Sequence, residues 1–207
     1  NAYGIPTTEE FLTNSVDEAI EKANSITYPV VLKVLSPDIQ HKTEAGALAL
    51  NINNDAELRN SYEEIVTSAK SHNDKADIRG VLVQEMVTDD NVEVIVGFSN
   101  DKNFGPVLTF GLGGIFVELL EDVSLRLPPI SEEAAREMIE ETLGSKLLKG
   151  FRGGLKADLD SLIDVIMKVG VLAEDFDQKI SALDINPLLV MKEGEGVKAA
   201  DALINLS

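Results

Sequence analysis

The chain has 207 residues and no cysteine, and its 36 acidic residues outnumber its 18 basic ones to give a formal net charge of -18. That charge repels the phosphates of a nucleic acid polymer, and the lack of cysteine excludes disulfides and thiolate metal sites. With only two histidines, His41 and His72, a metal would need oxygen ligands, which favours magnesium-type chemistry.

No apolar run approaches the ~18 residues that a membrane helix needs, and the sequence does not open on a secretory leader. We therefore expect a cytoplasmic protein that binds neither a membrane nor nucleic acid. Because the sequence begins without a methionine, we also expect that further residues precede it in the parent protein.

Helix and strand patterns alternate along the chain. Ser15 and Glu18 have the spacing of a capping box, and the apolar residues that follow predict a helix over 16–25. The nearly continuous apolar run 30–34 predicts a buried strand. In chain order, the remaining patterns predict a strand over 47–52, a helix over 55–69, strands over 79–84, 92–96 and 107–110, helices that begin at 131 and 159, and three short strands over 180–185, 188–191 and 197–200. This interleaving predicts an α/β or α+β sheet protein with two lobes.

Lys33 interrupts its apolar strand, and a buried ammonium costs several kcal/mol unless an anion compensates it. It is a candidate phosphate ligand, although a lysine that snorkels from a strand end has the same pattern. The polar loop that follows places His41 beside Lys42 and ahead of Gly46. A neutral imidazole is a competent phosphoryl acceptor near pH 7, and a glycine lets backbone amides face phosphate oxygens. The alternative is a surface loop with an incidental histidine.

Two further segments could contact a nucleotide. Glu85, Met86 and Val87 follow a predicted strand, where backbone groups can face an adenine edge while Met86 packs on the ring. A strand end with a core methionine would look the same. The glycine cluster further on has the wrong spacing for a dinucleotide-binding fingerprint, but as a mobile loop it could cover phosphates, with Gly113 and Gly114 as candidate contacts.

Oxygen-bearing side chains gather near the C-terminus. Asp184 and Asn186 occupy alternate positions of a predicted strand and hence one face, and we expect Pro187 to stop further pairing. Asp201, on the strand that follows, could supply a third oxygen. A magnesium ion that bridges nucleotide phosphates needs only one or two such protein groups, while an Asx turn explains the pattern without a metal.

In this order, these segments resemble the ATP-grasp domain of the NDP-forming acyl-CoA synthetases, particularly the β subunit of ADP-forming acetyl-CoA synthetase. The resemblance covers nearly the whole chain and is carried by Tyr3-Gly-Ile-Pro6, Tyr28-Pro-Val-Val-Leu-Lys33, the His41-Lys42 loop, Phe104-Gly-Pro106, Gly111-Leu-Gly-Gly114 and Asp184-Ile-Asn-Pro-Leu188. It implies the ATP-grasp fold, with two α/β lobes and the nucleotide cleft between them. We assign residues 20–84 to the N-terminal lobe, and residues 1–19 with 85–207 to the C-terminal lobe.

The resemblance also implies roles for the candidate residues. It makes His41 the phosphohistidine and Asp184 the carboxylate that orients it. The nucleotide would be held by Lys33, Lys42, Gly46, Glu85, Met86, Val87, Gly113 and Gly114, and Mg²⁺ by Asn186 and Asp201. The implied cofactors are ATP or ADP and Mg²⁺. The implied partner is a CoA-binding α subunit or α domain that carries the first phosphohistidine, either in a hetero-oligomer of the α2β2 kind or fused to this chain.

The implied reaction converts acyl-CoA, ADP and phosphate reversibly into free acid, CoA and ATP, with this chain transferring the phosphoryl group between phosphohistidine and ADP. One alternative is an ATP-grasp carboxylate–amine ligase without phosphohistidine, in which His41 would have no role. Another is a non-catalytic regulatory ATP-grasp module, which the joint presence of the candidate residues argues against. Nothing in the sequence selects the acid, and adenine is only weakly indicated over guanine.

Overall fold

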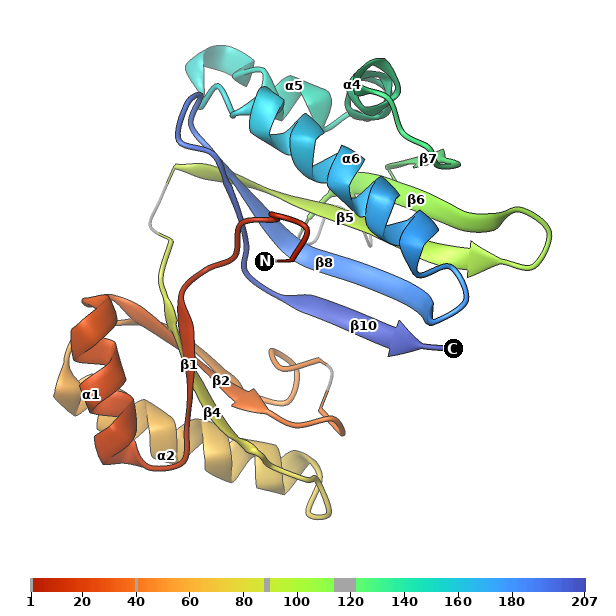
Figure 1. Ribbon diagram of the computed structural model, residues 1–207. Coiled ribbons are helices and arrows are strands. Elements are labelled where there is room, and N and C mark those ends of the chain that lie inside the picture. The colour runs from red at the N-terminus through yellow and green to blue at the C-terminus, as the bar shows by residue number, and fades with distance from the viewer. Residues whose placement is uncertain (1, 40, 88–89, 114–121) are drawn as a thin grey trace. The chain divides into compact units, whose positions relative to one another are not determined.

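The computed structural model describes residues 2–39, 41–87, 90–113 and 122–207. The chain forms two compact units (Figure 1), of which unit 1 comprises Asn1–Thr7 with Thr88–Ser207 and unit 2 comprises Thr8–Val87. Unit 2 thus includes residues 8–19 and 85–87, which the sequence led us to assign to the C-terminal lobe. The reason is that β1 (Glu10–Thr13) pairs with β4 (Gly80–Glu85). This pairing cannot be predicted from the residues of either strand alone.

Unit 2 is a four-stranded antiparallel sheet in the order β1-β4-β2-β3, in which β2 spans Val30–Leu35 and β3 spans Leu48–Ile52. Helices α1 (Val16–Ile26) and α2 (Asp55–His72) contact each other and the strands. Their apolar stripes meet the sheet in one core, whose fully buried members include Ala19, Ala23, Val30, Leu32, Val34, Leu58, Ala69 and Val83.

Both helices of unit 2 begin where the sequence supplies a cap. The Ser15 hydroxyl accepts the Glu18 amide at 3.2 Å, and the Asn54 side chain accepts the Glu57 amide at 3.0 Å. Each cap satisfies an amide that the helix itself leaves unpaired, which contributes about 1 kcal/mol. The predicted starts at 16 and 55 are therefore confirmed.

Unit 1 is built on a six-stranded antiparallel sheet. Five strands run in the order β10-β8-β5-β6-β7, and the sixth, β9, pairs with β8. Their bounds are β5 Asn91–Asp101, β6 Gly105–Leu112, β7 Val123–Arg126, β8 Ile180–Met191, β9 Val197–Ala199 and β10 Ala202–Leu206. The helical segments are α4 Glu132–Glu141, α5 Ser145–Leu148, the 3₁₀ turn Phe151–Gly153 and α6 Leu159–Asp175. Helix α6 lies across β5, β6 and β8 and buries its apolar face against them (Figure 1).

The expected end of pairing at Pro187 is wrong. Strand β8 runs through this proline as one element, where two short strands over 180–185 and 188–191 had been predicted. A proline removes one donor but keeps its carbonyl, and the Pro187 carbonyl accepts the Ala200 amide at 3.0 Å. The pairing with β5 shifts register at the same place, so a local irregularity accommodates the ring.

The N-terminal segment packs on unit 1. Ile5 is buried in its core, and the Lys168 ammonium donates to the Gly4 carbonyl at 2.8 Å. The Ala199 amide donates to the Pro6 carbonyl at 2.9 Å, which ties this segment to the end of β9. The N-terminal residues therefore help to fix the strand that leads into Asp201.

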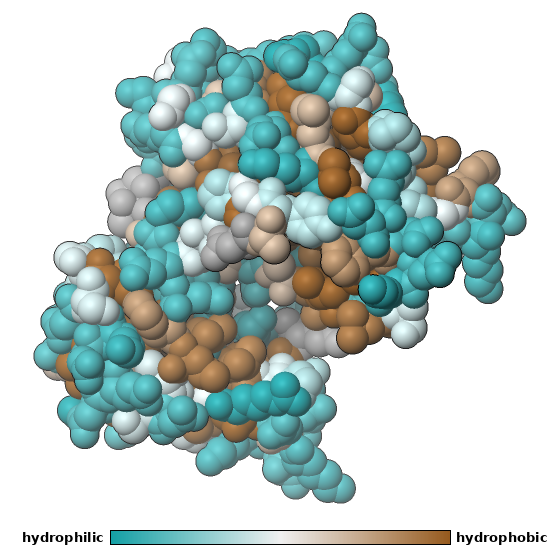
Figure 2. Space-filling view, viewed as in Figure 1, coloured by the Kyte–Doolittle hydropathy of each residue, from teal (hydrophilic) through white to brown (hydrophobic). Residues whose placement is uncertain are grey.

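The surface is largely polar in the view shown. Figure 2 shows hydrophilic side chains over much of the viewed face, with hydrophobic patches between them. Among the residues described, no helix combines the length and the apolar character needed to cross a membrane.

Candidate functional site

Lys33 occupies an interior position of β2, with β3 on one side and β4 on the other. It stands opposite Leu48 and Leu82, and its exposed fraction is only 8%. Its flanking residues Leu32 and Val34 are fully buried, so the lysine does not lie at a strand end from which it could snorkel. A buried ammonium needs compensating oxygen atoms, and this environment suits a lysine that serves an anion.

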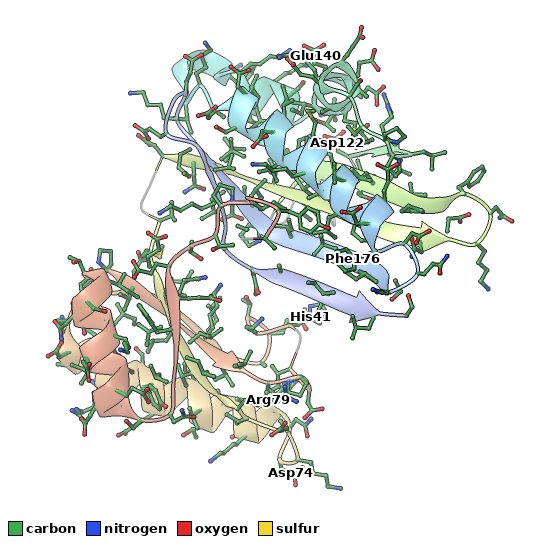
Figure 3. The ribbon with its side chains drawn as sticks, viewed as in Figure 1. His41, Asp74, Arg79, Asp122, Glu140 and Phe176 are labelled. Atoms are coloured by element: carbon green, nitrogen blue, oxygen red, sulfur yellow. The ribbon has the colours of Figure 1, made fainter. Side chains whose placement is uncertain are left out.

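His41 lies in the loop between β2 and β3 and is exposed (Figure 3). Hydrogen bonds within the loop hold its backbone: the Ala45 amide donates to the His41 carbonyl at 3.2 Å, and the Ala47 amide donates to the Lys42 carbonyl at 2.8 Å. Ala45 and Ala47 are buried and anchor the loop on unit 2. The imidazole is therefore presented on a structured turn in the loop that follows the strand of Lys33.

Gly46 adopts φ +59, a left-handed conformation that favours glycine. Its amide donates to the Thr43 carbonyl at 3.1 Å. In this conformation the amide is used within the loop, so contact with a phosphate oxygen would require this bond to be exchanged.

The segment that precedes β1 holds the end of β4, where Glu85, Met86 and Val87 are the candidate adenine contacts. The Glu85 amide donates to the Glu9 carbonyl at 2.9 Å, and the Glu9 amide donates to the Glu85 carboxylate at 2.8 Å. The Met86 amide donates to the Pro29 carbonyl at 3.3 Å. Met86 and Val87 are half-buried. The contact with Glu9 had not been predicted.

Asp184, Asn186 and Asp201 are brought together within unit 1. The Asn186 amide donates to the Asp201 carbonyl at 3.1 Å, and the Asn186 side chain hydrogen-bonds to the Asp184 carboxylate. Asp201 lies between β9 and β10, not on a strand as expected. Burial raises the pKa of the Asp184 carboxyl, the bond from Asn186 opposes this, and the nearby Asp201 charge adds to it.

This cluster fits a magnesium ion by its chemistry, because it offers carboxylate and amide oxygens and no nitrogen or sulfur ligand. In the part of the chain that the structure describes, no group of three histidine, cysteine or acidic side chains could hold a metal alone. A magnesium ion here would have to complete its octahedron with water and phosphate oxygens, as expected for a nucleotide-bound metal.

Gly97 is a residue near this cluster that the sequence reasoning missed. It lies in β5 directly opposite Asp184 in β8. A Cβ atom at this position would come within 2.3 Å of the Leu183 carbonyl oxygen. A single glycine within an alternating strand is a known sign of such close backbone approach, so the signal was present in the sequence.

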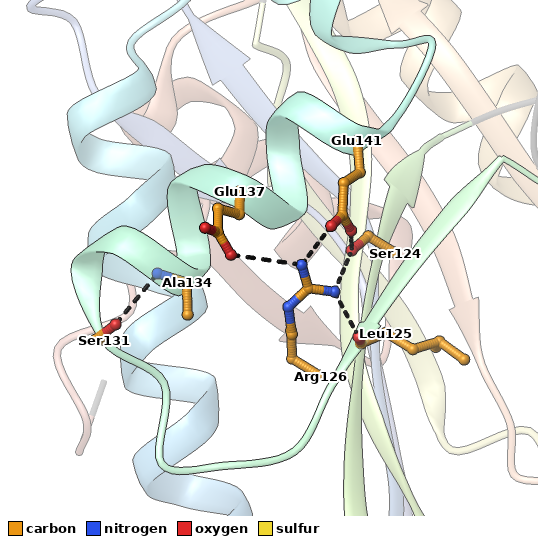
Figure 4. Close-up of polar contacts among 7 residues, drawn as sticks. All are labelled: Ser124, Leu125, Arg126, Ser131, Ala134, Glu137 and Glu141. Atoms are coloured by element: carbon orange, nitrogen blue, oxygen red, sulfur yellow. Dashed lines mark hydrogen bonds and ion pairs between the residues drawn. The ribbon is translucent and has the colours of Figure 1, made fainter.

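The glycine-rich segment is described only in part. Gly113 follows β6, and its amide donates to the Glu93 carbonyl at 2.8 Å. Gly114 lies outside the described residues. Further along, Arg126 pairs with Glu141 and lies 3.7 Å from the Glu137 carboxylate, which fastens β7 to α4 (Figure 4). Arg126 thus has a structural role within unit 1.

Comparison with known protein families identifies the family to which the chain belongs. The model of the ATP-grasp domain family matches residues 1–206. The chain belongs to this ATP-grasp family. The expected fold is thereby confirmed.

Three similar proteins narrow the assignment within this family. The chain is 43% identical over 205 residues to the acetate–CoA ligase [ADP-forming] II subunit beta of Pyrococcus furiosus, covering 99% of this chain and 86% of that subunit. It is 42% identical to the 4-hydroxybutyrate–CoA ligase [ADP-forming] of Nitrosopumilus maritimus, covering 99% of this chain but only 29% of that longer protein.

The third is a solved structure of the dinucleotide forming acetyl-coenzyme A synthetase 1 of Ca. Korarchaeum cryptofilum. It superposes with a TM-score of 0.84 at 37% identity, covering 100% of this chain and 87% of that chain. That structure holds coenzyme A and Mg-AMPPCP, and its phosphohistidine segment points towards the nucleotide binding site. The resemblance to the β subunits of ADP-forming acetyl-CoA synthetases, inferred from the sequence, is confirmed.

Proposed function

We propose that this chain is the nucleotide-binding part of an ADP-forming acyl-CoA ligase, and that His41 carries a phosphoryl group to ADP. The supporting observation is an exposed imidazole on a hydrogen-bonded turn, in the loop after a strand that contains a buried lysine. The chain is also 43% identical to an acetate–CoA ligase β subunit. In the direction of ATP synthesis, the phosphorus–nitrogen bond at His41 breaks. An oxygen of the ADP β-phosphate forms the new phosphorus–oxygen bond, and the ring leaves as neutral imidazole because its other nitrogen carries a proton.

The chain's own residues position these groups and neutralise their charge, which is what phosphoryl transfer mainly requires. Lys33, with Lys42 beside His41, would balance phosphate charge, and Gly46 would lie near the phosphates after its internal bond is exchanged. The raised pKa of Asp184 comes mainly from burial. In this proposal the Asp184 side chain orients the imidazole that carries the phosphate.

Asn186 and Asp201 would hold Mg²⁺, with Asp184 close enough to share it. When bound, Mg²⁺ offsets the negative charge on the transferring phosphoryl group. The backbone of Glu85, Met86 and Val87 would contact the adenine, and Gly113 with Gly114 would belong to the segment that covers the nucleotide.

The proposal includes a CoA-binding partner that carries the first phosphohistidine, either as an α chain or as a fused domain. Both arrangements occur among its relatives, one of which is named a β subunit and another of which is a longer single chain. The acid remains open, since the relatives include acetate and 4-hydroxybutyrate ligases. The cytoplasmic location stays a prediction from the sequence.

The decisive experiment is phosphorylation with Mg²⁺ and ATP labelled in the γ-phosphate, followed by mapping of the labelled peptide. We expect an acid-labile, base-stable adduct on His41 that is removed when ADP is added. His41→Ala should abolish the label. His72→Ala is the matched control and should keep it, because His72 is an exposed residue in the last turn of α2. An unlabelled wild-type chain, or label that survives in His41→Ala, would overturn the proposal and favour a ligase without phosphohistidine.

A further inference from the structure

One short stretch of unit 1 is basic in an otherwise acidic molecule. Over the whole chain, 36 acidic residues stand against 18 basic ones. Residues 145–156 contain no acidic residue but four of the basic ones, namely Lys146, Lys149, Arg152 and Lys156. This basic segment forms α5 and the 3₁₀ turn between α4 and α6 (Figure 1).

Two of its four cations are neutralised by neighbouring carboxylates. Lys149 donates to a glutamate of α4 at 2.9 Å, and Lys156 donates to a glutamate after β8 at 2.5 Å. Lys146 and Arg152 are exposed, and neither forms an ion pair with any residue that the structure describes. Since salt screens more distant acidic groups over about 8 Å, the basic segment keeps local positive charge that suits an anion.

The backbone of the 3₁₀ turn is also suited to an anion. Gly150 is left-handed at φ +86, Phe151 is helical, and Arg152 is left-handed again at φ +54. Alternation of right-handed and left-handed residues turns successive amides to one side and forms a concave nest for anions. The left-handed conformation is strained for arginine, although glycine adopts it freely, and such strain is typical of functional sites.

An exposed aromatic ring accompanies the guanidinium. Phe151 is 52% exposed, and the Arg152 Cζ atom lies 5.2 Å from its ring centroid. A guanidinium binds phosphate oxygens through paired hydrogen bonds, and an aromatic ring offers a face on which a base can stack. The two groups together fit a phosphate ester with a base better than they fit a bare anion.

The basic segment lies on the other side of the sheet from Asp184. In β8, Asp184 alternates with Leu183 and Ile185, which are both buried in the core that α6 covers. Successive side chains of a strand point to opposite faces, so Asp184 faces away from α6. Leu148 of α5 is buried in the same core as α6 and anchors the basic segment on that side.

We propose that the basic segment is a second binding site, which takes a phosphate monoester that carries a base. Arg152 and the amides of the turn would hold the phosphate, Lys146 would add positive charge, and Phe151 would stack on the base. Two sources share this chemistry, the 3′-phosphate of coenzyme A and the 5′-phosphate of a mononucleotide such as AMP. The inference does not rest on the proposed function, because none of these residues belongs to the candidate phosphoryl-transfer site.

The test is equilibrium dialysis of the full chain against labelled coenzyme A and, separately, labelled AMP. EDTA is present, because the candidate nucleotide site is proposed to need Mg²⁺. We expect saturable binding of at least one of the two, with inorganic phosphate competing about 10-fold more weakly because it has no base to stack. Dephospho-CoA identifies the source: if it fails to bind where coenzyme A binds, the 3′-phosphate is the group held, whereas binding of AMP alone assigns the site to a mononucleotide.

Variants of Arg152 separate binding from stability. Arg152→Gly removes the guanidinium and relieves the strained backbone, so monoester affinity should fall about 10-fold while the melting temperature stays equal or rises. A purely structural arginine would instead lower the melting temperature. Arg152→Asn repeats the test with another residue that tolerates the left-handed conformation. Phe151→Ala should reduce monoester affinity to about that of phosphate.

The matched control is Lys102→Ala, which removes one positive charge from an exposed lysine between β5 and β6 of the same unit. It should bind the monoester within about 2-fold of wild type. A wild-type chain that binds neither ligand, or an Arg152→Gly variant that binds as well as wild type, would overturn the inference, as would equal weakening in Lys102→Ala. Labelling of His41 should be unchanged in Arg152→Gly, and its absence from the wild-type chain would refute the proposed function alone.

Discussion

Gly97→Ala tests whether the spacing of β5 and β8 sets the position of Asp184. The Cβ atom of an alanine at this position would lie 2.3 Å from the Leu183 carbonyl oxygen and 3.2 Å from the Asp184 Cα atom. Ordinary van der Waals contact begins at 3.4 Å, and the conflicting atoms belong to the backbone, which cannot rotate away as a side chain can. The two strands would have to separate locally by about 1 Å to relieve the overlap.

The expected magnitude follows from this displacement. Overpacking of this kind costs about 1–3 kcal/mol, and for a chain of 207 residues each kcal/mol lowers the melting temperature by about 2–4 °C. The functional effect should be larger. A displacement of about 1 Å in a positioned catalytic group reduces a rate by about 100-fold, so phosphorylation at His41 should slow by that factor.

The assay combines a thermal melt with the rate of His41 labelling by Mg-ATP. Gly105→Ala is the control, because an alanine Cβ there meets nothing within 4 Å while its backbone keeps an unfavourable φ of +74. It should lose about 1 kcal/mol of stability through backbone strain and keep its labelling rate. A Gly97→Ala variant that is as stable and as fast as wild type would refute the argument. Equal slowing in the two variants would show that general destabilisation, not strand spacing, controls the rate.

Two further variants probe the helix cap of α6 and the proposed metal ligands. Asp158→Ala removes an acceptor for the amides of Ser161, Gly194 and Gly196, at 3.1, 3.0 and 2.9 Å, and should lower the free energy of unfolding in urea by about 2–3 kcal/mol. Burial alone would raise the pKa of Asp158, but these bonds outweigh it and lower the pKa. The wild-type advantage should therefore be complete above the ordinary aspartate pKa of about 4 and decline as the pH falls towards the depressed folded value, whereas a difference independent of pH would contradict this reading. Asn186→Ala should weaken ADP binding about 10-fold in Mg²⁺ and leave it nearly unchanged in EDTA, and calorimetry that finds equal weakening in both would exclude Asn186 as a metal ligand.

Features set by neighbouring residues could be predicted from the sequence. The capping residues Ser15 and Asn54 mark helix starts because a side-chain oxygen satisfies an amide within three residues. Lys33 was recognised as a candidate phosphate ligand because the other five residues of β2 are apolar and cannot compensate its charge. The alternation of Asp184 and Asn186 predicted a shared face, and their hydrogen bond agrees with it.

Features set by distant pairing could not be predicted in this way. β1 has only four residues, and its register with β4 joins positions 68 to 74 residues apart. Without that register, the bond between Glu9 and Glu85 has no local signature. Pro187 misled the prediction for a related reason, because the rule that a proline ends pairing concerns its missing amide, while its carbonyl still accepts from Ala200.

At the candidate site, the correct and the incorrect predictions from the sequence have the same physical cause. Period-two alternation determines which side chains of β8 share a face, but the height of Asp184 above the sheet depends on how closely β5 approaches, and Gly97 permits that approach. In the same way, the sequence of β4 predicts that a strand ends near Glu85, but the Glu9 amide that its carboxylate accepts comes from a distant segment of the chain. The chemical groups can therefore be read from each strand alone, whereas their positions depend on the neighbouring strand, and the Gly97 variant tests that dependence directly.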